Sequence, residues 1–477
     1  MQHRRESPCS ERKTLSDMIK LTDYKDKKIH FIGIGGCSMS GLAQILSNLG
    51  YNVDGSDIKE SSFTKTLMDS GIDVKIGHDE SYAKDASLIV YTPAIKPTNP
   101  EFAYAVQHDI MMIERAQLLG MISANYNQVV GVSGCHGKTT ITSMLACITK
   151  DSGIDPTVHV GGMVDFLSGG VCLGNSDIFI TEACEYVRSF MSLHPSAIIL
   201  NNIDDDHLDY YKDIDEIIDA FVDFIALLPE DGVLFINIDD KNNMKALARC
   251  APPKVVTYSA SGNADYCIKS VKFDDMGAPE FDVICRGENL GKIKLNVPGM
   301  HNAANALAAA ALAHEVFGIS IDECAKDLAD YHLAGRRFEK VGEKDGVTIF
   351  HDYAHHPSEI KACLEAAHNY PHRKLWVLFQ CNSYTRARTL KDKYASAFDN
   401  ADMVLVPDIY PGRDIDTGDI HARDLVSAIN AHSNNCVYLP TFREIRDYLR
   451  DRWQPGDIVL TLGSGDVNKQ QLILLDD

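Results

Sequence analysis

Residues 129–140 constrain what this chain can fold into and bind more than any other segment. They read Val-Val-Gly-Val-Ser-Gly-Cys-His-Gly-Lys-Thr-Thr, which is a β-branched strand followed by a glycine-rich turn and a helix start. Such a turn binds phosphates, because its backbone N–H groups point at the anion and the next helix presents its positive N-terminus. We therefore predict a nucleoside triphosphate site in which Lys138 reaches the β and γ phosphates and Thr139 ligates Mg²⁺.

The turn departs in one position from the strict phosphate-loop pattern. That pattern has glycine at position 132, where this chain has Val132, and the turn relies instead on Gly131, Gly134 and Gly137. The alternative is a glycine-rich turn that only starts a helix. The strand before the turn and the helix after it favour the phosphate site.

The composition of the chain excludes several classes of protein. Its 67 acidic residues outnumber its 46 basic ones, and because nucleic-acid binding needs basic clusters, that class is disfavoured. The 13 cysteines form no C-x-x-C pair, which argues against a zinc or redox site of that kind. The polar N-terminal residues resemble no secretory signal, and no apolar run is long enough to cross a bilayer. We expect a cytoplasmic protein without membrane insertion, either a monomer or a weak homodimer.

Three segments each begin a strand, turn and helix pattern, and 477 residues exceed what one hydrophobic core usually supports. We therefore predict an α/β fold of three domains, each built on a mainly parallel sheet. Residues 263–297 alternate apolar and polar positions, which predicts antiparallel strands at the edge of the second sheet. The predicted boundaries are a flexible lead at 1–25, a Rossmann-like domain at 26–120, a central phosphate-loop domain at 121–331 and a C-terminal Rossmann-like domain at 332–477.

The first domain opens on a second glycine-rich turn, at residues 33–43. A dinucleotide fingerprint would have its third glycine at position 38, where this chain has Ser38, so nicotinamide chemistry is not supported. The helix N-terminus can still hold a diphosphate, and Asp57 ends the next strand, where an acid meets a ribose hydroxyl in such folds. The alternative is a Rossmann-like turn that binds nothing.

Two residues of the central domain follow strands that end at the same sheet edge as the phosphate turn. They are Glu182 and His207, and with Thr139 they offer oxygen and imidazole ligands for one or two Mg²⁺ ions. Glu185 is a weaker candidate than Glu182, which could also be a helix cap or a surface charge. The acids at 204–206 could belong to a solvated loop.

Two further motifs suggest nucleotide contacts. Asn302 and Asn305 share one face at the start of an alanine-rich helix, where their amides could read adenine or simply cap the helix. Arg336, in the segment Gly-Arg-Arg-Phe, could clamp the γ-phosphate from the third domain or be an ordinary surface arginine.

The C-terminal domain has paired histidines, His355 and His356, between a strand and a helix. They could orient substrate, move a proton or bind a carboxylate. Zinc is a competing interpretation, but no further ligand stands at the spacing of a metal site, so the sequence disfavours it. Arg386 follows the next strand and would anchor a carboxylate, with an exposed arginine at a helix start as the alternative.

In this order the motifs resemble those of the Mur ligase family, over residues 27–467. The resemblance implies a first domain that binds a UDP-sugar, a central ATPase domain, and a C-terminal domain that closes on both and brings an amino acid. The segments that carry it are 33–43, 133–140, Glu182 with His207, 301–305, 335–338, 352–357 and 463–466.

The resemblance also implies roles for individual residues. The UDP-sugar residues would be Gly33, Gly35, Gly36, Ser38, Met39, Ser40 and Asp57. The ATP residues would be Gly134, His136, Gly137, Lys138, Thr139, Thr140, His301, Asn302, Asn305, Arg336 and Asp352. Thr139, Glu182 and His207 would bind the metal, and Lys138, His207, Arg336, His355 and Arg386 would be catalytic. His355 and Arg386 would face the incoming amino acid or the muramyl carboxylate.

The implied reaction is an ATP-dependent amide ligation that joins L-alanine to the lactyl carboxylate of UDP-N-acetylmuramic acid through an acyl phosphate, in peptidoglycan precursor synthesis. Sister ligases carry a carbamylated lysine in a segment that corresponds to residues 220–223, and the absence of lysine there agrees with the alanine-adding branch. A ligase that recycles a tripeptide onto the same sugar and a nucleotide-dependent switch remain alternatives. The departures from the family pattern are Cys135, His351, Cys381 and Asn382.

Overall fold

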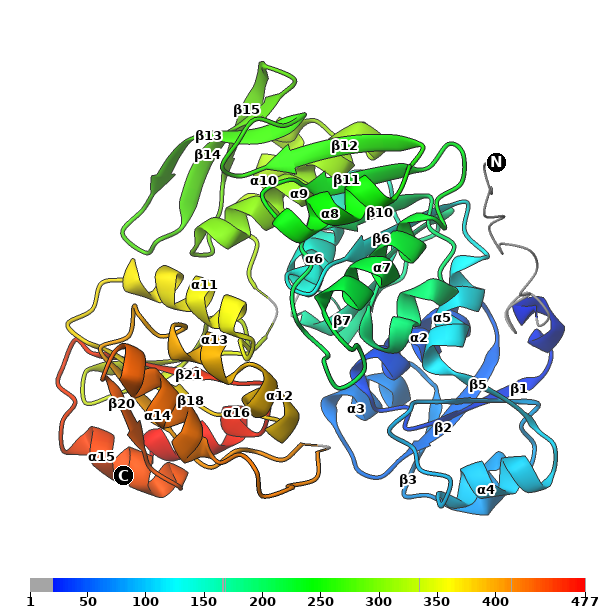
Figure 1. Cartoon of the computed structure of the whole chain (residues 1–477). Helices are drawn as coiled ribbons and strands as arrows, with labels where there is room; N and C mark the ends of the chain where they lie inside the picture. The colour runs from blue at the N-terminus through cyan, green and yellow to red at the C-terminus, as the bar shows by residue number, and fades with distance from the viewer. Residues whose placement is uncertain (1–19, 165–166, 168, 334, 413, 477) are drawn as a thin grey trace, which may run out of the picture.

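The computed structural model describes residues 20–164, 167, 169–333, 335–412 and 414–476. In these residues the strands form three sheets, of five, ten and six strands, with helices packed against them (Figure 1). Most neighbouring strands run parallel. The fold is therefore the predicted α/β class with three domains.

The first sheet has the order β3-β2-β1-β4-β5, and its strands are all parallel. The strand order reverses at β1, and ligands of such sheets bind at this reversal, beyond the carboxyl ends of the strands. The glycine-rich turn that follows β1 lies there. The elements are η1 (Leu21–Tyr24), β1 (Lys28–Ile32), α2 (Cys37–Asn48), β2 (Asn52–Asp57), α3 (Ser62–Asp69), β3 (Asp73–Ile76), η2 (Glu80–Ala83), β4 (Leu88–Tyr91), α4 (Pro100–Gln107), β5 (Met111–Glu114) and α5 (Arg115–Ser123).

The second sheet has the order β15-β14-β13-β12-β11-β10-β6-β9-β7-β8. Its strands run parallel from β13 to β7, whereas β13, β14 and β15 form the antiparallel edge that the sequence predicts. The elements are β6 (Gln128–Ser133), α6 (Lys138–Lys150), β7 (Thr157–Val164), β8 (Gly169–Cys172), β9 (Ile178–Glu182), η3 (Tyr186–Ser192), β10 (Ala197–Leu200), α7 (Ile214–Ile225), β11 (Val233–Asn237), α8 (Lys241–Arg249), β12 (Lys254–Ser259), β13 (Tyr266–Phe273), β14 (Pro279–Cys285), β15 (Glu288–Lys294), α9 (Met300–Phe317) and α10 (Ile321–Ala329).

The third sheet has the order β16-β17-β21-β18-β19-β20, and β16 alone of these strands runs antiparallel to its neighbour. The five parallel strands are short apolar runs, as expected where helices cover both faces. The elements are β16 (Glu339–Lys344), β17 (Val347–Asp352), α11 (Pro357–His368), β18 (Leu375–Phe379), α12 (Tyr384–Thr389), α13 (Lys391–Ala395), β19 (Met403–Val406), α14 (Ala422–His432), β20 (Cys436–Tyr438), α15 (Phe442–Arg450), β21 (Ile458–Leu462), α16 (Val467–Gln470) and η4 (Gln471–Leu474).

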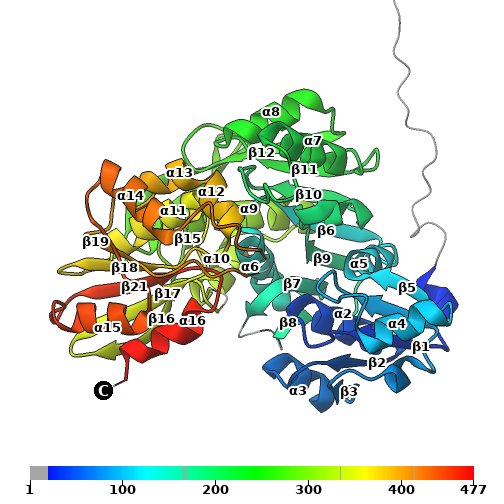
Figure 2. The same cartoon turned by 60° about the horizontal axis from the view of Figure 1, so that its bottom comes forward.

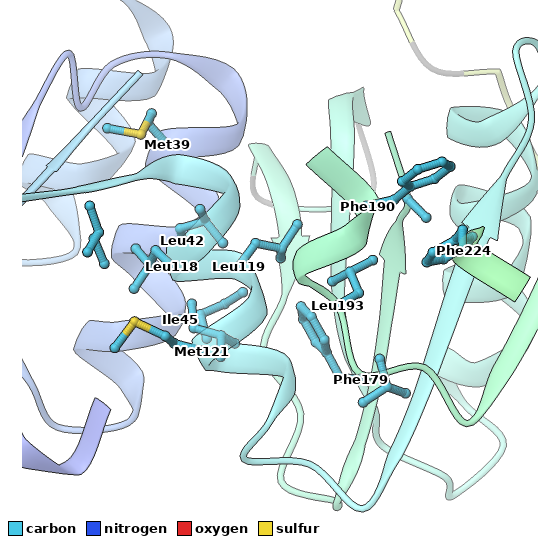
Figure 3. Close-up of a cluster of buried hydrophobic side chains, with 14 of the residues drawn as sticks. Met39, Leu42, Ile45, Leu118, Leu119, Met121, Phe179, Phe190, Leu193 and Phe224 are labelled. Atoms are coloured by element: carbon cyan, nitrogen blue, oxygen red, sulfur yellow. The ribbon is translucent and has the colours of Figure 1, made fainter. Parts of the chain in front are cut away.

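The first and second domains share one hydrophobic core. Apolar side chains of α2 and α5 pack against side chains of β9, η3 and α7 in a single buried cluster (Figure 3). Leu119 of α5 lies beside Leu193 and Phe179 of the central domain in this cluster. The helix α5 spans residues 115–123 and therefore crosses the predicted boundary at residue 120. The position of this domain boundary remains a prediction. We infer that these two domains are held together mainly by apolar burial.

The third domain contacts the central domain largely through polar pairs. It lies to the left of the first domain in both views, and in Figure 1 the central domain lies above both of them (Figures 1 and 2). Arg386 of α12 donates to Asp206 at 3.0 Å, and Lys393 of α13 pairs with Asp205. Polar contacts of this kind suit a domain that separates and closes during a reaction.

None of the helices in the described part of the chain combines the length and the apolar character needed to span a bilayer.

Candidate active site

The phosphate turn joins β6 to α6 in the form that its sequence predicts. Gly134 and Gly137 have φ of 134° and 85°, a region that favours glycine. A Cβ on Gly137 would lie 2.6 Å from Nδ2 of Asn201, so the close approach also requires glycine. The N–H of His136 donates to Oδ1 of Asn202 at 2.8 Å, which ties the turn to the loop after β10. The turn is therefore preformed for an anion.

Lys138 begins α6 and lies partly buried beside an acidic partner. Its Nζ donates to Oε2 of Glu185 at 2.8 Å and to the carbonyl of Gly134. Burial lowers the pKa of Lys138, but Glu185 outweighs this and holds the pKa above its usual value. His207 lies 3.5 Å from the other oxygen of Glu185. Glu185, the weaker candidate from sequence, is thus the acid that contacts both Lys138 and His207.

Glu182 and Thr139 lie together on another side of the turn. Glu182 ends β9, and its Oε1 accepts the N–H of Gly161 at 2.6 Å. Burial raises the pKa of Glu182, although a hydrogen bond from Thr139 and the nearby Lys138 act against it. A bound cation would stabilise the ionised carboxylate, so the chemistry of Glu182 and Thr139 fits an oxygen-preferring ion such as Mg²⁺.

A cavity of about 320 Å³ lies between the phosphate turn and the third domain. Several predicted nucleotide residues line it: His136, Gly137, Thr140, His301, Asn302, Asn305 and Asp352. Oδ1 of Asn305 accepts from Nδ2 of Asn201, and Oδ2 of Asp352 accepts the N–H of Phe338 at 2.8 Å. The structure therefore brings the predicted adenine and phosphate residues into one pocket.

A second cavity, of about 810 Å³, is lined by all three domains. Cys37 and Phe63 come from the first domain, Thr139 from the central one, and Arg336 and Arg337 from the third. Since Thr139 directly follows Lys138, the phosphate turn opens onto this cleft. A ligand held by the first domain and a triphosphate held by the second would meet there.

Arg336 and Arg337 differ in their surroundings. Arg336 stacks on Tyr353 at 4.7 Å and donates to the carbonyls of Gly463 and Gly465, at 3.4 and 3.3 Å. Arg337 is partly buried, lies 3.8 Å from Oε1 of Glu359, and lines both cavities. The sequence selected Arg336, and that choice stays a prediction. The geometry favours Arg337 as the phosphate contact, because Arg337 lines both cavities. The sequence alone could not distinguish between the two adjacent arginines.

We expect Arg337→Ala to lower kcat/KM for ATP about a hundredfold, because one charged donor in a water-poor site contributes on this scale. Arg336→Ala should cost no more than about tenfold, since its donors already serve backbone carbonyls. Steady-state kinetics at saturating sugar and amino acid measure both variants. A larger loss in Arg336→Ala than in Arg337→Ala would reverse this assignment.

In the first domain, the turn after β1 is held by Asp57, whose Oδ2 accepts the N–H of Gly35 at 2.9 Å. A Cβ on Gly35 would lie 2.6 Å from a methyl carbon of Thr64, so glycine is required there. The side chains of Met39 and Ser40 are buried in α2. The N–H of Ser40 already donates to the carbonyl of Gly36. Of these two residues, only the backbone N–H of Met39 is therefore available for a diphosphate.

Two side chains that the sequence did not single out hold Ser38. Its hydroxyl accepts from Nη1 of Arg115 at 3.1 Å and lies 3.1 Å from Nε2 of His159, which comes from the central domain. Arg115 directly follows β5, a position that could have suggested a role at this sheet edge. His159 lies in β7, which carries two glycines and gave no clear strand signal.

His159 makes the stability of this contact depend on pH. Burial, and then the nearby Arg115, lower the pKa of His159 to about 4, so the folded chain keeps this side chain neutral. The unfolded side chain binds a proton below about pH 6.5, so the stability from His159 is present above that pH and is lost as pH falls towards 4.

Between pH 7 and pH 5, we expect the free energy of unfolding to fall more in wild type than in His159→Gln. The difference should be up to about 1.4 kcal/mol per pH unit. Calorimetric unfolding at several pH values measures the difference. Identical pH dependence in the two proteins would contradict the account.

On the C-terminal side, Arg386 lines a small cavity with His207, and both Arg386 and His355 lie close enough to Asp206 to lower the pKa of that carboxyl group. Nη2 of Arg386 donates to Oδ1 of Asp206 and Nη1 donates to Oδ1 of Asn382, at 3.0 and 2.7 Å. In this arrangement the predicted carboxylate anchor is paired with a carboxylate of the central domain. Burial lowers the pKa of His355 to about 4, although Glu359 acts in the opposite direction, so His355 is neutral near pH 7.

Comparison with protein families agrees with this three-part site. Residues 28–127 match the model described as Mur ligase family, catalytic domain. Residues 132–313 match the Mur ligase middle domain, and residues 336–465 match the Mur ligase, glutamate ligase domain. The chain belongs to the Mur ligase family, which confirms the resemblance seen in the sequence.

One curated relative and two solved structures are similar to this chain over almost its whole length. A UDP-N-acetylmuramate--L-alanine ligase of Acetivibrio thermocellus is 44% identical over 460 residues, covering 96% of this chain and 97% of that protein. The crystal structure of a UDP-N-acetylmuramate-alanine ligase from Thermotoga maritima matches with a TM-score of 0.76 at 24% identity, covering 94% of this chain and 98% of that one. A murein peptide ligase from Psychrobacter arcticus matches with a TM-score of 0.70 at 24% identity, with the same coverage. The two structural matches support the fold.

Proposed function

We propose that this chain is an ATP-dependent amide ligase that joins L-alanine to the lactyl carboxylate of UDP-N-acetylmuramic acid, in peptidoglycan precursor synthesis. The observation that carries the proposal is the cleft in which Thr139 of the phosphate turn faces residues of both other domains. A triphosphate bound there can react with a carboxylate held by the first domain. The relative that aligns over nearly the whole chain supports the choice of sugar and amino acid.

Each domain has one task in this proposal. Residues 26–120 bind the UDP-sugar, residues 121–331 bind ATP, and residues 332–477 close on both and bring alanine. The shared core between the first two domains keeps the sugar site and the ATP site in a fixed relative position. The polar contacts of the third domain allow it to release product.

In the first step, the lactyl carboxylate attacks the γ-phosphorus of ATP. The bond from that phosphorus to the bridging oxygen breaks, ADP leaves, and an acyl phosphate forms. Lys138 and Arg337 neutralise charge on the transferring phosphoryl group. When bound to Thr139, Glu182 and His207, Mg²⁺ would supply further charge neutralisation.

In the second step, the neutral amine of alanine attacks the acyl carbon, and the tetrahedral intermediate expels inorganic phosphate to leave an amide. His207 lies 3.5 Å from Glu185 and is a ligand of the metal in this proposal, so it is not free to take the amine proton. His355 is neutral near pH 7, so of the two histidines it is the better acceptor for the amine proton. When substrate binds, Arg386 would release Asp206 and pair with a carboxylate of the substrate.

The assignment is tested by weighing the nucleotide product. The chain is incubated with ATP, Mg²⁺, UDP-N-acetylmuramic acid and one of alanine, serine, glycine or tripeptide, and the product is analysed by mass spectrometry. We expect the alanine conjugate to dominate and ADP release to require both the sugar and the amine. A conjugate formed only with tripeptide would favour the recycling ligase, and ATP hydrolysis without amine would favour a nucleotide switch.

The remaining properties follow the same proposal. ATP and a nucleotide sugar are substrates of the cell interior, so we infer that the chain acts in the cytoplasm. We also infer that it works as a monomer or a weak homodimer, because each described domain contributes to one site within a single chain.

A further inference from the structure

Three potential metal ligands meet where the central and C-terminal domains touch. His136 belongs to the phosphate turn, Asp204 follows β10, and His356 is the N-cap of α11. Among the described residues, these side chains form a group whose ligand atoms all lie within 4.8 Å of one another. Nε2 of His136 and Nδ1 of His356 lie 3.3 and 3.4 Å from the same oxygen, Oδ2 of Asp204.

These spacings match those around a tetrahedral zinc ion. Zinc binds imidazole nitrogen at roughly 2.0–2.1 Å and carboxylate oxygen at roughly 2.0–2.2 Å, which places neighbouring ligand atoms about 3.3 Å apart. The two contacts to Asp204 already have this length. The two imidazole rings lie 4.9 Å apart, so a small side-chain rotation completes the set.

The other nitrogen of each ring is held by an acceptor, as in known zinc sites. Nδ1 of His136 lies 3.3 Å from Oε1 of Glu359, and Nε2 of His356 lies 3.2 Å from the carbonyl of Asp205. With a proton on each of these nitrogens, the remaining lone pairs face Asp204. Carboxylates and carbonyls in this position orient histidine ligands and raise their basicity.

Without a metal, other groups fill the same positions. Nδ1 of His356 accepts the N–H of Ser358 in a long contact of 3.3 Å, and the hydroxyl of Ser358 donates to Oδ2 of Asp204. A metal ion would replace these contacts, leaving its fourth position open to water. The sequence did not reveal the group, because 68 residues separate His136 from Asp204 and His356 lies in another domain.

We propose that His136, Asp204 and His356 form a zinc site that links the central domain to the C-terminal domain. Two imidazoles with one carboxylate suit zinc, whereas oxygen atoms make up most of the ligands of Mg²⁺. The site shares no residue with the proposed magnesium ligands Thr139, Glu182 and His207. It ties the phosphate turn directly to the first turn of α11.

The test is zinc binding to the full chain, stripped with a chelator and titrated with zinc against a chromophoric chelator in excess Mg²⁺. Neither ATP nor sugar is present, so the result does not depend on ligase activity. We expect one zinc ion per chain. His136→Gln and His356→Gln, which remove one ligand from each domain, should each weaken binding at least tenfold, and Glu359→Gln about tenfold.

His421→Gln and His432→Gln are the matched controls, because both histidines are exposed and also lie beside an aspartate. They should bind zinc as wild type does. If a histidine variant unfolds, Asp204→Asn, which keeps the side-chain shape, provides the same comparison. X-ray absorption of the zinc complex should show nitrogen and oxygen ligands that include imidazole. Absence of tight binding, equal affinity in the ligand variants, or sulfur coordination would overturn the proposal.

Discussion

Replacing Lys138 with alanine is expected to lower kcat at least about a thousandfold and to leave the binding of UDP-N-acetylmuramic acid unchanged. Lys138 is the first residue of α6, and its ammonium group lies within the phosphate turn. Loss of a preorganised charge at the transferring phosphoryl group has effects of this size. The sugar is proposed to bind in another domain, so calorimetric titration with it should give the wild-type affinity.

Lys150→Ala is the control for this prediction. Lys150 ends the same helix, at the end distant from the phosphate turn, and it is exposed. This variant should keep wild-type turnover. Because Lys138→Ala leaves the buried Glu185 without its lysine partner, the thermal unfolding of both variants is compared with wild type. A folded Lys138→Ala protein that retains a tenth of wild-type activity would refute the role of the turn.

Gly120→Ala is expected to destabilise the chain by about 1–3 kcal/mol. Alanine normally stabilises a helix interior by about 1 kcal/mol relative to glycine. Here a Cβ on Gly120 would lie 2.2 Å from the carbonyl oxygen of Ser192, so either α5 or η3 must move. The clash outweighs the helix preference, and thermal unfolding should occur at a lower temperature than in wild type.

Gly335→Ala is the matched substitution, because a Cβ at Gly335 would meet no atom within 4 Å. Its unfolding temperature should stay close to that of wild type. A Gly120→Ala protein as stable as wild type would show that the first two domains do not pack as closely as described.

The glycine-rich turns and the buried strands could be predicted because their signals are local. Gly134, Gly137 and the residues around them carry the phosphate turn within a dozen positions, and the apolar runs of the third sheet are nearly continuous. β16 was missed because its sequence, Glu-Lys-Val-Gly-Glu-Lys, is mostly charged. It forms a strand by pairing with β17 at the sheet edge, which is a tertiary effect.

The site was predicted less completely, because orientation depends on the fold. The sequence placed Glu182 and Glu185 on one segment, and only the structure shows that Glu185 contacts Lys138. In the same way it could not choose between neighbouring arginines, or foresee that His159 reaches Ser38 from another domain. Contacts between domains leave no periodic pattern in the sequence, so they could not be predicted from it.

Transfer of heavy oxygen tests the central claim most directly. UDP-N-acetylmuramic acid labelled with heavy oxygen in its lactyl carboxylate is converted with ATP and alanine, and the released phosphate is weighed. If the carboxylate takes the γ-phosphoryl group before the amine attacks, each phosphate carries one labelled oxygen. Unlabelled phosphate formed alongside the amide product would contradict the acyl-phosphate route, and with it the role assigned to the cleft that all three domains line.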